Sequence, residues 1–184
     1  MSELHPAFTV RQPAGEDRPR RVCDHCGFID YVNPRIVVGS VATWDAAGEE
    51  TRVLLCRRAI EPRRGFWTLP AGYMETGEST WAAAAREARE EAFAEIAIDA
   101  LIAVYDIPRI SQVQLMHRAR LLSPEIAPGD ESLEVALFRW ADIPWSELAF
   151  PSVHWTLHQW RATRDDPAPV PGRNPPGEED PAGL

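Results

Sequence analysis

The chain has 184 residues, of which 45% are hydrophobic, and a formal net charge of −9. The length suits one domain with a small appendage, and the acidic balance argues against DNA or RNA as the main ligand. Apolar runs are short and interrupted by charged residues, so we expect no membrane span. The first residues also lack the pattern of a secretory signal.

Three cysteines are present, at Cys23, Cys26 and Cys56. An odd number of cysteines in a chain without a recognisable secretion signal argues against a disulfide framework. We therefore expect a reducing, cytoplasmic setting for this protein.

Residues 1–33 are expected to form an N-terminal arm that contains a tight turn. The first part is polar and irregular and includes the basic cluster RPRR, and the sequence CDHC follows. This Cys-x2-Cys spacing is typical of one half of a zinc ribbon, whose closed site needs four ligands. His5 and His25 are the only nearby substitutes for the missing pair. The sequence favours a degenerate, zinc-ribbon-like segment without metal, and zinc at Cys23 and Cys26 is the alternative.

Residues 34–164 are predicted to form the main domain, an α/β sandwich with a mixed sheet. One helix is expected from Trp81 to about Ala92, after an N-cap at Ser79 or Thr80, because alanines follow a capping residue there. A second helix is expected over 151–164. Apolar and β-branched runs indicate strands within 34–44, 51–59, 66–75, 94–108, 113–123 and 135–143.

Residues 165–184 differ in composition from the main domain. They contain six of the 17 prolines and almost no large apolar side chains. Such a segment cannot bury enough apolar surface to offset the entropy of ordering, so we predict a disordered tail.

The first predicted helix carries a dense acidic segment. Glu87, Glu90 and Glu91 lie three and four residues apart, so they share one helix face. Three carboxylates directed at one point repel each other unless a cation neutralises them, and Mg²⁺ or Mn²⁺ prefers such oxygen ligands. An ordinary solvated helix face with arginine–glutamate pairs would give a similar sequence.

The segment from Gly72 to Glu91 follows the pattern G-x5-E-x7-R-E-x2-E-E. This pattern resembles the Nudix box, the signature of hydrolases that act on a nucleoside diphosphate linked to another moiety. The stretches CDHCGFIDYVNPRIVVGSV, LLCRRAIEPRRGFWTLPAGYMETGES and DESLEVALFRWADIPWSELAFPSV are similar to the ADP-ribose/FAD pyrophosphatase branch. The resemblance covers about residues 22–160. It implies the Nudix fold, an α/β/α sandwich, and hydrolysis of a pyrophosphate bond with Mg²⁺ or Mn²⁺.

The resemblance also implies roles for individual residues. Arg86 and Glu78 would orient the site, and Glu87 and Glu91 would act in catalysis as well as in metal binding. The implied metal ligands are the carboxylates of Glu87, Glu90 and Glu91 and the backbone carbonyl of Gly72 or Ala71. Relatives of this branch often have an earlier second cysteine pair, which this sequence lacks.

Phe93 departs from the box, which normally has glycine at this position. That glycine lets the chain leave the helix with a positive φ. A phenylalanine in the same conformation would be strained by roughly 1–2 kcal/mol. We therefore expect either that the helix runs past its usual end or that Phe93 lies strained at that end.

The general base that activates water must be a carboxylate near the reacting phosphate. Some family members use a glutamate of the box, and others use one from a distant loop. The distant candidates here are Glu131 and Glu134 in the sequence GDESLE, and we favour Glu134. Either residue could instead be an ordinary exposed acid.

The sequence offers only single candidate residues, and no motif, for contacts with the rest of the substrate. Tyr105 is a candidate for stacking on a base, and Arg58 and Arg109 are candidates for binding phosphate or ribose. ADP-ribose hydrolases of the family tend to have a proline near the position of Pro108. We therefore rank ADP-ribose and FAD-like substrates above NADH.

Two other functions are compatible with parts of the sequence. The first is a non-catalytic nucleotide sensor on the same fold, and the second is a zinc-ribbon adaptor for nucleic acid. The complete set of charged residues in the box argues against the first, and the incomplete ribbon and acidic balance argue against the second. We expect a small-molecule nucleotide as the partner, no membrane partner, and a possible homodimer.

Overall fold

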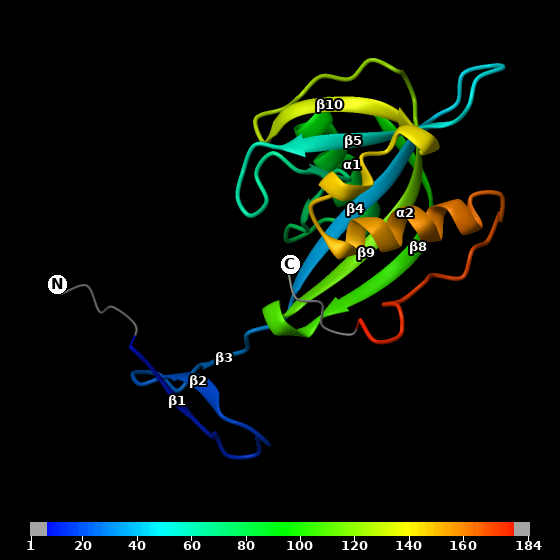
Figure 1. Ribbon diagram of the computed structural model, residues 1–184. Helices are drawn as coiled ribbons and strands as arrows, with labels where there is room; N and C mark the ends of the chain where they lie inside the picture. Colours follow the sequence, from blue (N-terminus) through cyan, green and yellow to red (C-terminus); the bar gives the residue numbers. More distant parts are fainter. Residues whose placement is uncertain (1–6, 179–184) are drawn as a thin grey trace. The chain divides into compact units, whose positions relative to one another are not determined.

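The computed structural model describes residues 7–178. They belong to two units, one that ends at Pro34 and one that begins at Arg35, and Figure 1 shows both. The first unit is a small antiparallel sheet of β1 (Phe8–Arg11), β2 (Arg20–Cys23) and β3 (Ile29–Asp30), in that order. Val22 and Cys23 are buried in this unit.

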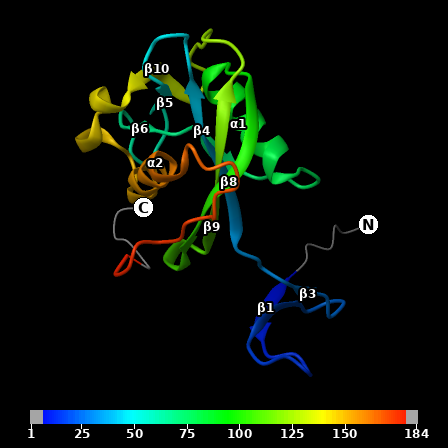
Figure 2. The ribbon, with the colours of Figure 1, turned by 90° about the vertical axis from the view of Figure 1, so that its right-hand side faces the viewer.

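The second unit is a mixed sheet with one helix on each face, as Figure 2 shows. The strand order is β10-β5-β4-β9-β8, with β6 paired to β5 and β7 paired to β4. The strands are β4 (Arg35–Trp44), β5 (Arg52–Arg58), β6 (Trp67–Thr68), β7 (Ala71–Tyr73), β8 (Ile96–Ile107), β9 (Gln112–Leu121) and β10 (Ser132–Arg139). Short 3-10 helices are η1 (Pro108–Ile110), η2 (Trp140–Asp142) and η3 (Trp145–Glu147).

The centre of the sheet is a parallel pair, whereas its other neighbours are antiparallel. Strand β4 runs beside β9 from the pair Arg35–Gln112 to the pair Thr43–Arg120. The predicted hairpin between β4 and β5 is present, but these strands pair only near the turn, at Thr43 and Trp44 of β4. The sheet therefore depends on contacts between segments far apart in the sequence.

The helices cover two separate hydrophobic clusters. Helix α2 (Pro151–Thr163) contributes to a cluster on one face that contains Val41, Leu55, Ile102, Tyr105, Leu157 and Trp160. Helix α1 (Thr80–Ala92) packs against the other face, where the cluster contains Ala42, Leu54, Ala88, Ala92 and Ala119. Burial of a large apolar side chain stabilises by about 1.5–3 kcal/mol, so both faces contribute to the core. The predicted α/β sandwich with a mixed sheet is confirmed.

Residues 165–178, whose composition predicts a disordered tail, form hydrogen bonds with the sheet. Gly172 exchanges backbone hydrogen bonds with β8, donating to Ile102 O at 2.8 Å and accepting from Val104 N at 2.9 Å. The Asn174 side chain binds both the N–H and the carbonyl of Asp106. Proline lacks an N–H, but one glycine and one asparagine provide enough donors and acceptors to pair with a strand edge. Residues 179–184 of the predicted tail lie outside the described residues.

A helix that could cross a membrane would need a long apolar span. Within residues 7–178 the structure contains none.

Candidate active site

Helix α1 begins and ends at well-defined residues. Ser79 is the N-cap, and its Oγ accepts a hydrogen bond from Ala82 N at 3.1 Å. The helix ends at Phe93, which has φ 48° and ψ 29°. Of the two expectations for this position, the strained left-handed phenylalanine is found and the extended helix is not. Hydrogen bonds from Phe93 N to Arg89 O and from Ala94 N to Ala88 O close the last turn.

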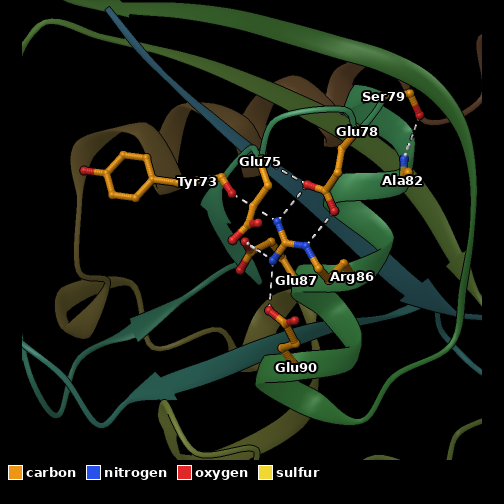
Figure 3. A network of polar contacts seen from close by, with 8 residues as sticks. All are labelled: Tyr73, Glu75, Glu78, Ser79, Ala82, Arg86, Glu87 and Glu90. Carbon is orange, nitrogen blue, oxygen red and sulfur yellow. Dashed lines mark hydrogen bonds and ion pairs between the residues drawn. The ribbon is translucent and has the colours of Figure 1, made fainter.

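Arg86 organises the acidic residues around the start of the helix (Figure 3). Its Nε and Nη2 donate to the two carboxylate oxygens of Glu78 at 2.8 and 3.0 Å. Its Nη1 donates to Glu87 at 2.7 Å and to Glu90 at 2.8 Å, and Nη2 also reaches the Tyr73 carbonyl. The hydrogen bonds from Arg86 lower the pKa of Glu78 to about 2. The guanidinium therefore holds three carboxylates in fixed positions.

Glu87 lies directly against the loop that precedes the helix. A Cβ at Gly72 would overlap the Glu87 carboxylate, so only glycine permits this approach. Burial raises the pKa of Glu87, and the hydrogen bond from Arg86 opposes that rise. The sequence expectation that Gly72 and Glu87 contribute to the same site is consistent with this contact.

Glu91 is the most deeply buried acid of the group. It is 7% exposed, and burial, followed by the charge of Glu87, raises its pKa to about 8. The backbone N–H of Ala71 opposes this rise in the pKa of Glu91. Burial, followed by the charge of Glu91, raises the pKa of the neighbouring Cys56 thiol. A negative charge on the Glu91 carboxyl is costly because the group is shielded from water and lies near the charge of Glu87.

The two distant acids lie in different places. Glu131 and its neighbour Asp130 line the same cleft as Glu87 and Glu91. Glu134 lies on β10, where it forms an ion pair with Arg57 at 3.5 Å, and it is not among the residues that line the cleft. The preference for Glu134 as the base is therefore not supported, whereas Glu131 lies on the cleft.

The cleft beside the glutamates has a volume of about 1150 Å³. Arg58 lines it, with its guanidinium 5.2 Å from the centre of the Phe150 ring. Tyr105 does not, because it is 1% exposed and packs edge-on against Trp155 in the core. Arg109 lies exposed in η1, and the cleft lining includes its neighbour Ile110 instead.

Several residues of the cleft were not identified from the sequence. Tyr73 is about half exposed, and its hydroxyl accepts hydrogen bonds from Arg35 at 3.1 Å and Gln112 at 3.2 Å. Gln114 in turn donates to Gln112. The spacing of two between Gln112 and Gln114 places both on one face of β9, a signal that the sequence contained. Tyr73 also directly follows the glycine of the acidic motif.

The carboxylates on the cleft are oxygen ligands of the kind that a hard divalent cation prefers. Among residues 7–178, no three His, Cys, Asp or Glu side chains already converge as a metal site. Arg86 instead supplies positive charge between Glu87 and Glu90. The donors still fit a hard cation, because they are carboxylates and a cation would remove the cost of charge on the buried Glu91. Glu90, with 58% of its side chain exposed, is free of packing that would prevent its rotation.

The N-terminal unit contains the two remaining cysteines. Cys23 is buried and Cys26 is exposed. Backbone N–H groups of Cys26 and His25 lower the pKa of the Cys23 thiol. In the described part of the chain no third ligand joins this pair, so these residues alone do not fit a closed zinc site.

Two sequence profiles match the chain. The NUDIX domain profile matches residues 34–161, and the zinc-ribbon profile of the Nudix N-terminal segment matches residues 5–32. The chain belongs to the Nudix family. Nudix hydrolases act on pyrophosphate bonds, and this chain is therefore an enzyme of that class, as the resemblance implied.

This Nudix hydrolase is similar to proteins from several organisms. It is 27% identical to an ADP-ribose pyrophosphatase of Methanocaldococcus jannaschii over 124 aligned residues, and this aligned region covers 65% of this chain and 69% of that protein. A NUDIX hydrolase structure from Nitrosomonas europaea is 43% identical with a TM-score of 0.83, covering 94% of this chain and 96% of the other. The NUDIX domain of Shewanella oneidensis NrtR, complexed with ADP ribose, has the same fold at 20% identity, with a TM-score of 0.61, covering 73% and 90% of the two chains.

Proposed function

We propose that this Nudix hydrolase cleaves the pyrophosphate bond of ADP-ribose or of an FAD-like compound. The observation that carries the proposal is the set of glutamates held by Arg86 beside the buried Glu91, all on a cleft of about 1150 Å³. A cleft of this size accommodates a large nucleotide. The similarity to an ADP-ribose pyrophosphatase supports the choice of substrate.

The walls of the cleft offer groups suited to the two ends of such a substrate. Arg58 and Arg35 provide positive charge for phosphate or ribose oxygens. The half-exposed ring of Tyr73 provides an aromatic surface for a planar base. Gln112 and Gln114 provide amide donors and acceptors beside that ring. These groups replace Tyr105 and Arg109 as candidates for substrate binding.

Nudix hydrolases generally use divalent metals, and Mg²⁺ or Mn²⁺ is the cofactor proposed here. Glu87, Glu90, Glu91 and the backbone carbonyl of Gly72 would hold it. When bound, such a cation neutralises phosphate charge and lowers the pKa of water. Arg86 keeps Glu87 and Glu90 in place, and Glu131 accepts the proton of the water that attacks phosphorus. One P–O bond forms, the bridging P–O bond breaks, and two phosphomonoesters leave.

The test is a substrate panel of ADP-ribose, FAD, NADH, CoA and diadenosine polyphosphates, each with Mg²⁺ and with Mn²⁺. We expect the highest kcat/KM with ADP-ribose or FAD, and no turnover after metal is removed with EDTA. Glu87→Gln should be inactive, whereas Glu95→Gln, an exposed acid paired with Arg89, should retain activity. Turnover of NADH alone would show a different dinucleotide substrate, and binding without turnover would show a sensor.

A second comparison decides between the two distant acids. Glu131→Gln should lower kcat by roughly 100-fold, the size of effect usual for loss of a general base. Glu134→Gln should leave kcat unchanged, because neither Glu134 nor its partner Arg57 is among the residues that line the cleft. The reverse result would restore Glu134 as the base.

A further inference from the structure

The loop that carries Glu131 is attached to the C-terminal end of helix α1. Ala127 N donates to Ala92 O, and Gly129 N donates to Glu91 O, both at 3.0 Å. The last carbonyls of a helix have no partner within the helix. Here the loop of residues 127–131 satisfies two of them, so its position is tied to the same helix that carries the glutamates.

Gly129 approaches the helix more closely than any other residue type could. A Cβ at this position would overlap the backbone carbonyl oxygen of Glu90. Its φ lies outside the left-handed region, so the backbone conformation itself does not demand glycine. Glycine is required at position 129 because the loop and the last turn of α1 leave no space for a Cβ.

A tight turn follows directly from this contact. Ser132 N donates to Gly129 O at 3.0 Å, which leaves Asp130 and Glu131 at the two central positions. Ala59 N donates to the Glu131 carbonyl at 2.8 Å and fixes the other side of the turn. Both acids line the cleft, and the charge of Glu131 acts on Glu87 and Glu91.

We propose that Gly129 is a positioning residue, which sets the distance of the Glu131 carboxylate from the glutamates of α1 by docking its loop on the end of that helix. The inference rests on the proposed function, in which Glu131 accepts the proton of the attacking water. Gly129 is not among the residues that line the cleft, whereas Glu131 is, so Gly129 acts through Glu131 and not by contact with substrate.

The experiment compares Gly129→Ala with Gly172→Ala in the full chain. Gly172 is a matched control, since its φ is also outside the left-handed region and an added Cβ would meet only the end of the Gln159 side chain, away from the cleft. A displacement of about 1 Å at a catalytic group can cost on the order of 100-fold in rate. We expect Gly129→Ala to lose kcat on that scale with KM and the Mg²⁺ concentration for half-activation unchanged, and Gly172→Ala to match the wild type.

The double variant tests whether Gly129 acts through Glu131. In a Glu131→Gln background, Gly129→Ala should cause no further loss of kcat, because residues that act as a unit are not additive. A further loss of the same size, or a raised Mg²⁺ requirement, would show that the substitution acts on the metal-site glutamates instead and would overturn the inference. A wild-type kcat for Gly129→Ala would overturn it as well.

The wild-type protein gives an independent measurement if Gly129→Ala does not fold. Amide hydrogen exchange should show the Ala127 and Gly129 N–H groups protected to the same extent as the end of α1. Rapid exchange at both would mean that the loop is not docked, and the inference would fail. An inactive wild-type protein with protected amides would instead contradict the proposed function alone.

Discussion

Arg86 is the residue on which the geometry of the glutamates depends. One guanidinium bonds Glu78, Glu87, Glu90 and the Tyr73 carbonyl at 2.7–3.0 Å. A planar group with five donors can serve four acceptors at once, whereas the ammonium of lysine has three donors on a tetrahedral nitrogen. The planar guanidinium of Arg86 therefore fixes the orientation of the three carboxylates.

We therefore expect Arg86→Lys to keep the positive charge and still lower kcat by roughly 100-fold, because the carboxylates lose their alignment. Arg139→Lys is the matched control, since Arg139 pairs with Asp142 in an exposed ion pair outside the cleft. Steady-state kinetics and a thermal midpoint for both variants make the comparison. Equal kcat for Arg86→Lys and the wild type would contradict this role.

Phe93 carries strain that can be measured separately from activity. Its left-handed backbone disfavours any residue with a Cβ, and its side chain is 61% exposed, so little packing offsets the cost. Phe93→Gly should raise the free energy of unfolding by about 1 kcal/mol. Phe93→Ala should give no such increase, because alanine keeps the Cβ. Urea denaturation measures the free energy of unfolding of both variants. An equal increase for alanine and glycine would show that the exposed phenylalanine ring, and not the left-handed backbone, is the cause.

At this scale, spacing predicted one feature of the site. The three- and four-residue intervals in α1 put Glu87, Glu90 and Glu91 on one helix face, and all three line the cleft, although within residues 7–178 they do not converge as a metal site. Spacing was less informative for Glu134, which is not among the residues that line the cleft, and for Tyr105, which is buried in the cluster under α2. Those facts are set by tertiary contacts that one sequence does not display.

At the scale of elements, the segment after α2 acts as an additional partner for the edge strand β8. Its backbone pairs with β8 through Gly172, and Arg118 Nη1 donates to the carbonyls of Thr163, Arg164 and Asp166. An uncovered edge strand is a site for unwanted pairing with another chain. The segment 165–178 therefore protects the edge that lies beside α2.

The contact of Asn174 with Asp106 gives a test of this attachment. Asn174→Ala removes two hydrogen bonds to the backbone of β8 and should destabilise the segment by about 1–2 kcal/mol. Amide exchange at Val104 and Asp106 should become faster. Arg173→Ala, which changes an exposed neighbouring residue, is the control. Unchanged exchange in Asn174→Ala would show that the segment is held elsewhere.

The strands could be predicted from the sequence, whereas their pairing and the attachment of the last segment could not. Each apolar run contains strand residues, because periodicity and burial agree locally, but the run 66–75 is divided between β6 and β7 and the run 135–143 ends in η2. The hydrogen bonds between residues 165–178 and β8 were not predicted, because composition reports apolar content, whereas these bonds come from a few residues. The parallel pairing of β4 with β9 was not predicted either, since nothing local encodes a partner so distant.

At the scale of the whole molecule, the N-terminal unit retains the turn of a zinc ribbon with only two cysteines. Cation–π contacts of Arg20 with Tyr31 and of Arg21 with Phe8 stabilise this small sheet. These contacts, with the buried Val22, offer a source of stability that needs no metal.

We expect protein purified without chelator to contain no stoichiometric zinc. Elemental analysis measures this directly. Both thiols of the pair should react with a thiol reagent in the folded protein, Cys26 faster than Cys23 because it is exposed. A Cys26→Ser variant should have the same thermal midpoint as the wild type. One zinc per chain, lost in Cys26→Ser, would show that the ribbon is closed by ligands outside the described residues.

The parallel pair at the centre of the sheet has a consequence for how the chain is made. A ribosome releases β4 early, but β9, which pairs with it along nearly its whole length, emerges only after β5, α1 and β8. Until then β4 has only short pairings, with β5 near their turn and with β7. Contacts between distant segments form slowly, and an unpaired apolar strand is prone to aggregate. The order of synthesis therefore leaves β4, the strand that later lies in the middle of the sheet, without its main partner until β9 has been made.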